Sequence, residues 1–246
     1  MKKILLSIFG ILLFAFAHAQ DTDSVRIRTD YSKIDLSNRP NDHFMIQYGY
    51  DGWLNTPDSA TPSGFSRHFN FYFMYDKPLK TNPHLSLAIG LGLGSSNMFF
   101  KDTYINLKSP TEELPFQTVN SANHYKKYKL TTIYGEVPLE FRYVSNPVSH
   151  DKGFKAALGL KIGTLLKSYT KGKNLLDASG RSVYGEKYIN KEQAKNFINT
   201  NRFAATARFG YGILSIDGSY QLNNFLKQGA GAAFHPYSIG LTLSGL

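Results

Sequence analysis

The stretch that decides the fold is residues 85–94, which read LSLAIGLGLG. Large aliphatic side chains alternate there with serine, alanine and glycine. Because successive side chains of a β-strand point to opposite faces, this period of two predicts a strand with one apolar face and one face of small residues. Glycine weakens a strand unless a close neighbour needs the space. We therefore expect the small face to line a crowded interior.

The same alternation recurs along the chain. Predicted strands cover residues 44–51, 69–76, 85–94, 133–143, 154–163, 202–209, 214–222 and 237–244. The connections between them alternate between long and short, which is typical of consecutive antiparallel strands with long loops at one end and short turns at the other. The prediction is an all-β fold, an eight-stranded antiparallel up-and-down transmembrane β-barrel whose apolar face meets lipid. Within the long segment 171–201, Asn190 and Gln193 resemble a capping pair and predict a short helix through Ile198.

A soluble β-sandwich or a lipocalin-like barrel is the alternative. Either would bury the apolar face and turn the small face toward water, so the exposure of Leu87, Ile89 and Leu91 distinguishes it from a membrane barrel. In the membrane barrel the outward aromatic side chains should form two interfacial bands. The predicted outer band is Tyr50, Trp53, Phe69, Phe99, Tyr220 and Tyr237, and the predicted inner band is Phe44, Tyr75, Tyr143, Phe154, Phe209 and Tyr211.

The first residues indicate export. Lys2 and Lys3 precede an apolar run over residues 4–16, and residues 17–19 read AHA, an A-x-A cleavage site. The apolar run is too short to cross a bilayer as a helix. We expect a cleaved signal peptide over residues 1–19, a periplasmic tail over 20–41, a barrel over 42–246 and a location in the outer membrane.

Composition excludes several classes of protein. The 246 residues include no cysteine, so disulfide frameworks, thiolate metal sites and cysteine nucleophiles are ruled out. The 14% of aromatic residues argues against disorder. The formal net charge is +10, but no basic run is long enough to predict nucleic-acid binding. Neither a metal site nor a cofactor site is predicted from residue spacing.

Charged residues on the inward parity predict a network inside the barrel, because charges in a narrow interior need partners. The predicted lumen network is Glu136, Glu140, Arg142, Lys155, Lys161, Arg202, Arg208 and Asp217. A catalytic carboxylate pair is disfavoured, since Glu136 and Glu140 lie about 13 Å apart along one strand. His68, His124, His235 and Ser238 lie at the outer rim or in a loop without a recognisable triad motif, so no catalytic residue is predicted.

A second group of charges is expected at the outer surface. It consists of Lys126, Lys127, Lys129, Lys167, Lys171 and Lys173, and contact with lipopolysaccharide is the hypothesis. Ordinary solvated loop charge is the alternative.

Residues 134–139 read YGEVPL, followed by further apolar alternation. This stretch resembles the Tyr-x-Glu-Ile/Val-Pro-Leu strand of the Bacteroidota outer-membrane β-barrel family that includes PorT, on the motif residues Tyr134, Glu136, Val137, Pro138 and Leu139. The resemblance implies the barrel fold and a link to type IX protein secretion. Because proline cannot donate a ladder hydrogen bond, we expect a bulge or kink at Pro138.

The sequence thus predicts a non-enzymatic outer-membrane barrel, a structural or accessory component of the cell envelope. Its expected partners are outer-membrane lipid, lipopolysaccharide and other envelope or secretion proteins. A narrow channel for ions or small solutes and a lipid-A-modifying enzyme are the alternatives.

Overall fold

A computed structural model describes residues 43–56, 60, 62–119, 123–149 and 152–245. The predicted signal peptide over 1–19 and the predicted tail over 20–41 lie outside these residues. Within the described ranges, no helix is long and apolar enough to cross a membrane.

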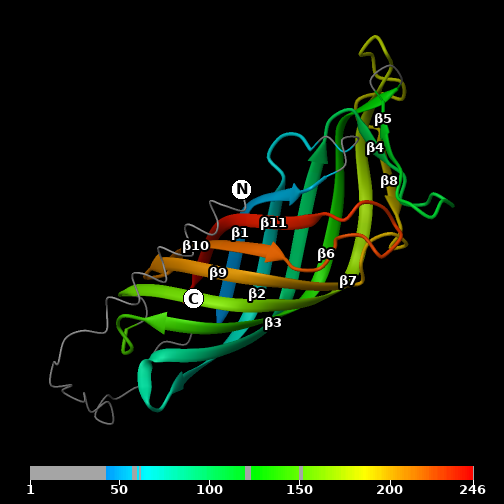
Figure 1. Cartoon of the computed structure of the whole chain (residues 1–246). Coiled ribbons are helices and arrows are strands. Elements are labelled where there is room, and N and C mark those ends of the chain that lie inside the picture. The colour runs from blue at the N-terminus through cyan, green and yellow to red at the C-terminus, as the bar shows by residue number, and fades with distance from the viewer. Residues whose placement is uncertain (1–42, 57–59, 61, 120–122, 150–151, 246) are drawn as a thin grey trace, which may run out of the picture. The chain divides into compact units, whose positions relative to one another are not determined.

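Eight long strands form one closed barrel (Figure 1). They are β1 (Phe44–Leu54), β2 (Arg67–Leu79), β3 (Asn82–Phe100), β6 (His124–Val144), β7 (Phe154–Leu176), β9 (Asn201–Tyr211), β10 (Leu214–Gln221) and β11 (His235–Ser244). Each pairs with the next of these strands in an antiparallel register, and β11 returns to pair with β1, closing the sheet. The predicted up-and-down barrel is confirmed.

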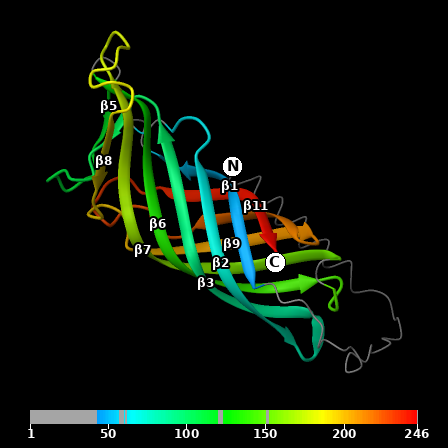
Figure 2. The same ribbon diagram turned by 180° about the vertical axis from the view of Figure 1, so that it is seen from behind.

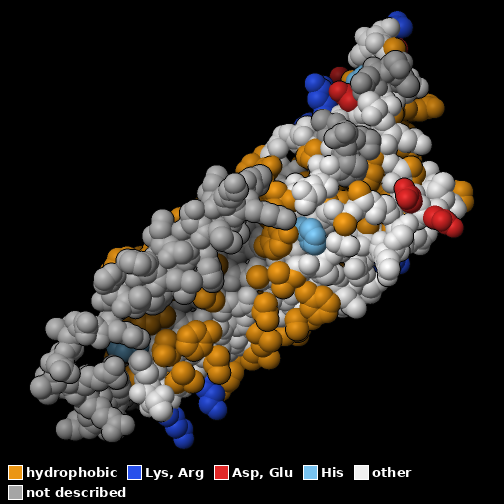
Figure 3. All heavy atoms as spheres, in the orientation of Figure 1, with side chains coloured by type: hydrophobic (Ala, Val, Ile, Leu, Met, Phe, Trp, Pro, Cys, Tyr) orange, Lys and Arg blue, Asp and Glu red, His pale blue; other side chains and the backbone are white. Residues whose placement is uncertain are grey.

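The apolar face of the sheet points outward. Leu87, Ile89 and Leu91 are 56%, 50% and 67% exposed, whereas Ser86 and Ala88 beside them are buried. Hydrophobic side chains accordingly gather on the outside of the barrel in Figure 3. The sandwich alternative, which needs these three aliphatic side chains inside, is wrong.

Trp53 is an exception to the predicted aromatic bands. It is buried, 9% exposed, and packs against Phe100, Phe225 and Phe234. The physical reason is parity: Trp53 follows Asp51 on the inward face of β1, so its ring turns into the barrel mouth and not toward lipid.

The inward glycines make room for large polar side chains. A Cβ atom at Gly94 would lie 2.6 Å from a Glu136 oxygen, and one at Gly49 would lie 2.8 Å from the His68 ring. A Cβ at Gly92 would lie 2.0 Å from the Phe71 carbonyl oxygen and 2.6 Å from the Tyr72 ring. The small residues are therefore needed because the neighbouring strands carry bulky side chains beside them on the inward face.

Three strands extend well beyond the others on the side of the long loops (Figure 2). β3 continues to Phe100, β6 begins as early as His124, and β7 continues to Leu176. A further strand, β8 (Ile189–Gln193), pairs with the edge of β7. The helix predicted from Asn190 is wrong, because these residues pair with β7 as a strand. A small hairpin of β4 (Thr103–Ile105) and β5 (Phe116–Thr118) lies in the same region.

A hydrogen bond ties this hairpin to the extension. The Tyr104 hydroxyl of β4 donates to Glu192 of β8 at 2.8 Å. Burial and this hydrogen bond raise the pKa of Tyr104 above its ordinary value, so the phenol stays protonated and able to donate.

A one-residue bulge interrupts β7. Tyr134 pairs with Leu165 and Ile133 with Lys167, so Leu166 is the extra residue. Before it, the odd-numbered Lys155 and Lys161 are buried in the bore; after it, the even-numbered Ser168 and Thr170 are buried. The bulge thus turns the later odd-numbered side chains of β7 to the outside.

The kink expected at Pro138 takes a milder form. Pro138 pairs regularly with Lys161 of β7, while on the β3 side the ladder is open between Ile89–Leu139 and Gly92–Glu136 without any change of register. The predicted bulge is therefore not at Pro138. The missing N–H is accommodated by a local opening of the ladder.

Two alanine substitutions test the crowding of the bore. Gly92→Ala should lower the free energy of unfolding by about 1–3 kcal/mol, the usual cost of overpacking, since the new methyl meets backbone and the Tyr72 ring. Gly135→Ala is the matched control, because a Cβ there lies 3.5 Å from Leu166, an ordinary contact. Urea unfolding of the barrel in lipid vesicles measures both, and equal stability of the two variants would contradict the crowded bore.

Candidate functional site: the filled lumen

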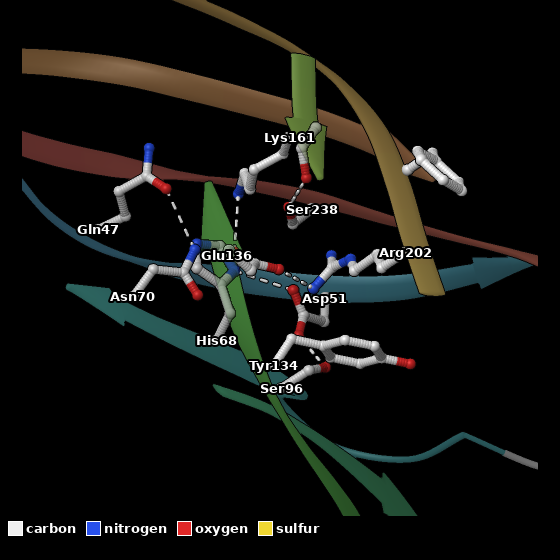
Figure 4. Close-up of polar contacts among 12 residues, drawn as sticks. Gln47, Asp51, His68, Asn70, Ser96, Tyr134, Glu136, Lys161, Arg202 and Ser238 are labelled. Atoms are coloured by element: carbon white, nitrogen blue, oxygen red, sulfur yellow. Dashed lines mark hydrogen bonds and ion pairs between the residues drawn. The ribbon is translucent and has the colours of Figure 1, made fainter. Parts of the chain in front are cut away.

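Glu136, itself buried, is the centre of a charge cluster inside the barrel (Figure 4). Its Oε1 accepts a hydrogen bond from Arg202 Nη1 at 3.0 Å, and its Oε2 accepts one from the Tyr72 hydroxyl at 2.5 Å. Lys161 Nζ lies 3.9 Å from the same Oε2. Both cations also lie over aromatic rings, Lys161 over Tyr72 at 5.4 Å and Arg202 over Tyr134 at 5.5 Å. Four strands are thereby linked across the bore.

A second cluster lies closer to the short turns. Glu140 Oε2 accepts hydrogen bonds from Arg142 Nε at 2.7 Å and from Arg208 Nη2 at 2.9 Å. Arg208 Nη1 also donates to the Ser244 hydroxyl at 2.9 Å. Arg142 Nη1 lies 3.7 Å from the Asp76 carboxylate. Glu136 and Glu140 therefore each hold their own cations and do not act as a pair.

Asp51 organises a third group. Its Oδ1 lies 2.9 Å from His68 Nδ1, and its Oδ2 accepts a hydrogen bond from the Ser96 hydroxyl. In a serine-nucleophile triad the histidine lies between the serine and the carboxylate. Here the carboxylate lies in the middle, so His68 is not placed to take the Ser96 proton.

Neutral side chains form a further line of hydrogen bonds along the wall, which ends at Asp217. Gln47 donates to the Thr242 hydroxyl at 3.0 Å, Asn70 donates to Gln47 at 3.1 Å, and Thr242 donates to Asp217 at 3.1 Å. The polar wall is thus connected from β2 to β10 by direct side-chain hydrogen bonds.

The residues predicted for the lumen network all lie inside the barrel. Six of them form ion pairs with one another, namely Glu136, Glu140, Arg142, Lys161, Arg202 and Arg208. Asp217 is held by Thr242, and Lys155 is buried near the short turns. Sequence reasoning left out Asp51, His68, Tyr72 and Asp76, although the same inward parity on β1 and β2 would have found them.

Little space remains between these groups. A cavity of about 20 Å³ lies between Glu140, Lys161, Arg208 and Asp217. A single water molecule needs roughly 10–15 Å³ on this measure, so the cavity holds about one.

An apolar plug fills the mouth of the barrel at the end that carries the long loops. Trp53 packs on Phe100, Phe225 and Phe234 with ring centroids 4.7–5.4 Å apart. Around them lie buried aliphatic side chains of the long loops: Ile105, Leu107, Leu114, Ile198 and Leu226. A β-bridge between Ile198 and Leu226 joins two of these loops. Strand period accounts for the inward position of Trp53 on β1, but it does not predict the part of the plug that comes from irregular segments, such as Phe225 and Phe234.

The predicted surface lysines are only partly brought together. Lys126, Lys127, Lys129, Lys171 and Lys173 line one groove on the outside of the extension. Lys167 lies apart from it, with its ammonium 6.0 Å from the Tyr169 ring. In the described part of the chain, no group of three or more His, Asp or Glu side chains is placed to hold a metal ion.

Comparison with known families agrees with this geometry. Residues 37–227 match the model of the outer membrane protein beta-barrel domain. The chain belongs to this family. It is therefore an outer-membrane β-barrel protein, as the outward apolar belt requires. No curated protein matches the sequence.

Removing one buried charge tests the network. Glu136→Gln should lower the free energy of unfolding by about 3–5 kcal/mol, because Arg202 and Lys161 lose the carboxylate that compensates them inside the bore. Asp177→Asn is the matched control, since Asp177 pairs with Arg181 in an exposed turn and should change stability little. Urea unfolding in vesicles measures both. A Glu136→Gln variant as stable as the control would show that the network does not hold the barrel together.

Proposed function

We propose that this protein is a non-conducting, non-enzymatic barrel, a structural or accessory component of the outer membrane. The observation that carries the proposal is the double closure of its bore. Ion pairs fill the middle, and the apolar plug around Trp53 fills the outer mouth. A conducting pore needs a continuous polar path for water and ions, and the apolar plug interrupts such a path.

The surroundings of His68 support a role without chemistry. His68 lies inside the bore near the rim, and its ring contacts Asp51 and lies against the Gly49–Gly240 pair. It is 4% exposed, away from the lipid face where a lipid-A-modifying enzyme must receive its substrate. Its contacts fit a group that fills space and pairs with a carboxylate.

An accessory role fits the extracellular side. The barrel uses long strands and the small β4–β5 hairpin to hold loops beyond the membrane, which is a way to present a surface to other envelope proteins. The resemblance of residues 134–139 to the PorT-containing family supports a connection with protein secretion. Copurification from native outer membrane, followed by identification of the retained proteins, tests that connection.

Single-channel recording in planar bilayers tests the closed bore. The purified barrel should give no discrete current steps under conditions in which a general porin, inserted in the same bilayer, conducts. Regular steps of uniform size from the barrel would favour the alternative, a narrow channel for ions or small solutes.

A further inference from the structure

Three pairs of lysines lie directly opposite each other in the extension of the barrel. Lys127 pairs with Lys173, Lys129 with Lys171, and Lys171 in turn with Lys191 of β8. Directly opposed residues of antiparallel strands have Cβ atoms about 5 Å apart, and like charges in that position destabilise the sheet. Strands paired through such lysines therefore gain stability when an anion lies between the lysines.

These lysines share one face, the outside of the barrel. The bulge at Leu166 is the reason, because without its extra residue Lys171 and Lys173 would keep the inward parity of Lys161. The bulge thus directs these lysines to the outside of the barrel. Inside the bore, Lys155 and Lys161 already supply cations.

A groove runs over this face, and we call it the basic groove. It is an open cavity of about 490 Å³ lined by Arg67, Phe99, Lys127, Lys129, Lys171 and Lys173, together with Phe65, Lys126 and backbone of the neighbouring loop. The Phe99 ring forms its floor, with the Arg67 guanidinium 5.3 Å and the Lys129 ammonium 5.8 Å from the ring centroid. None of the described residues that line it carries a carboxylate. The described residues of the groove therefore supply cations and no anion to compensate them.

The level of the groove points to the source of that charge. Below Arg67 the outward side chains of β2 are Phe69, Phe71 and Phe73, all exposed as expected at lipid. On β6 the last outward aliphatic is Ile133, and Lys129 lies four residues beyond it, roughly 13 Å along the strand and less in height because the strands tilt. A lysine side chain can also bend back toward the membrane surface. The basic groove thus lies at the headgroup layer of the outer leaflet, with the apolar belt directly beneath.

We propose that the basic groove binds the phosphate groups of lipid A, the phosphorylated glycolipid of the outer leaflet. Ammonium and guanidinium groups from β2, β6 and β7 converge on the phosphates, and the acyl chains lie along the belt around Phe69 and Leu93. The ligand cancels the repulsion between the opposed lysines. This inference does not depend on whether the bore conducts.

Lipid binding by the refolded full barrel tests the proposal. The probes are lipid A carrying its phosphates, the same lipid after dephosphorylation, and inorganic phosphate alone, each added to the barrel in neutral detergent and followed by native mass spectrometry. Phosphorylated lipid A should be retained best, and its binding should weaken as salt is raised. The double variant Lys129→Glu/Lys171→Glu should bind it at least about tenfold more weakly.

A control with the same change in net charge separates the groove from general surface charge. Lys108→Glu/Lys187→Glu alters two exposed lysines outside the groove and should bind like the unmodified protein. Equal losses in both double variants, equal retention of dephosphorylated lipid A, or saturation of the site by inorganic phosphate alone would each overturn the proposal.

A stability measurement is independent of binding. Without anionic lipid, Lys171→Glu should raise the urea midpoint, because it converts two opposed like-charge pairs into opposite-charge pairs. With phosphorylated lipid A present, the unmodified barrel should gain stability and the variant should not. A variant that is destabilised without lipid and still stabilised by it would contradict the role of the lysines.

Discussion

The structure depends on one constraint: a closed sheet of eight strands has an interior only as wide as its own side chains, and that interior is cut off from water. Every group that enters it must fit and be compensated. Glu136 meets this requirement through Tyr72, Arg202 and Lys161, and glycines on the neighbouring strands β3 and β7 provide the room. Replacing one partner leaves a buried charge without its counterion, which is why we regard the network as a single unit.

At the end that carries the long loops, the bore is filled by apolar side chains instead of ion pairs. Beyond the charge clusters aromatic side chains fill the bore, and Trp53 packs at tilted angles against Phe100, Phe225 and Phe234. The plug also gives the long loops a core of their own. Loops with a packed core hold a defined shape, which the proposed role of presenting a surface to other proteins requires.

The sequence predicts the structure only where apolar and polar side chains alternate with the two-residue period of a strand. Within the membrane, lipid on one side and a narrow bore on the other impose strict alternation, so the strand around Ile89 and the inward position of Glu140 could be read directly. Beyond the membrane the alternation fades, and the extension of β6 toward His124 and strand β8 were missed. Leu165 and Leu166 are both apolar, so the alternation of apolar and polar residues does not reveal the extra residue of the bulge. The parity of a residue shows whether its side chain points inward, but not which inward side chains meet across the bore. The contact of Glu136 with Arg202 therefore could not be predicted.

The central claim is that the bore is filled and closed to solvent, and thiol labelling tests it most directly because the chain contains no cysteine. Ser215→Cys places a thiol inside the bore at a residue only 1% exposed, and Ser179→Cys places one in an exposed turn. A water-soluble maleimide should label position 179 rapidly in the folded barrel and position 215 only after unfolding in urea. Rapid labelling of position 215 in the folded barrel would mean that water has access to the bore, and the account would be wrong.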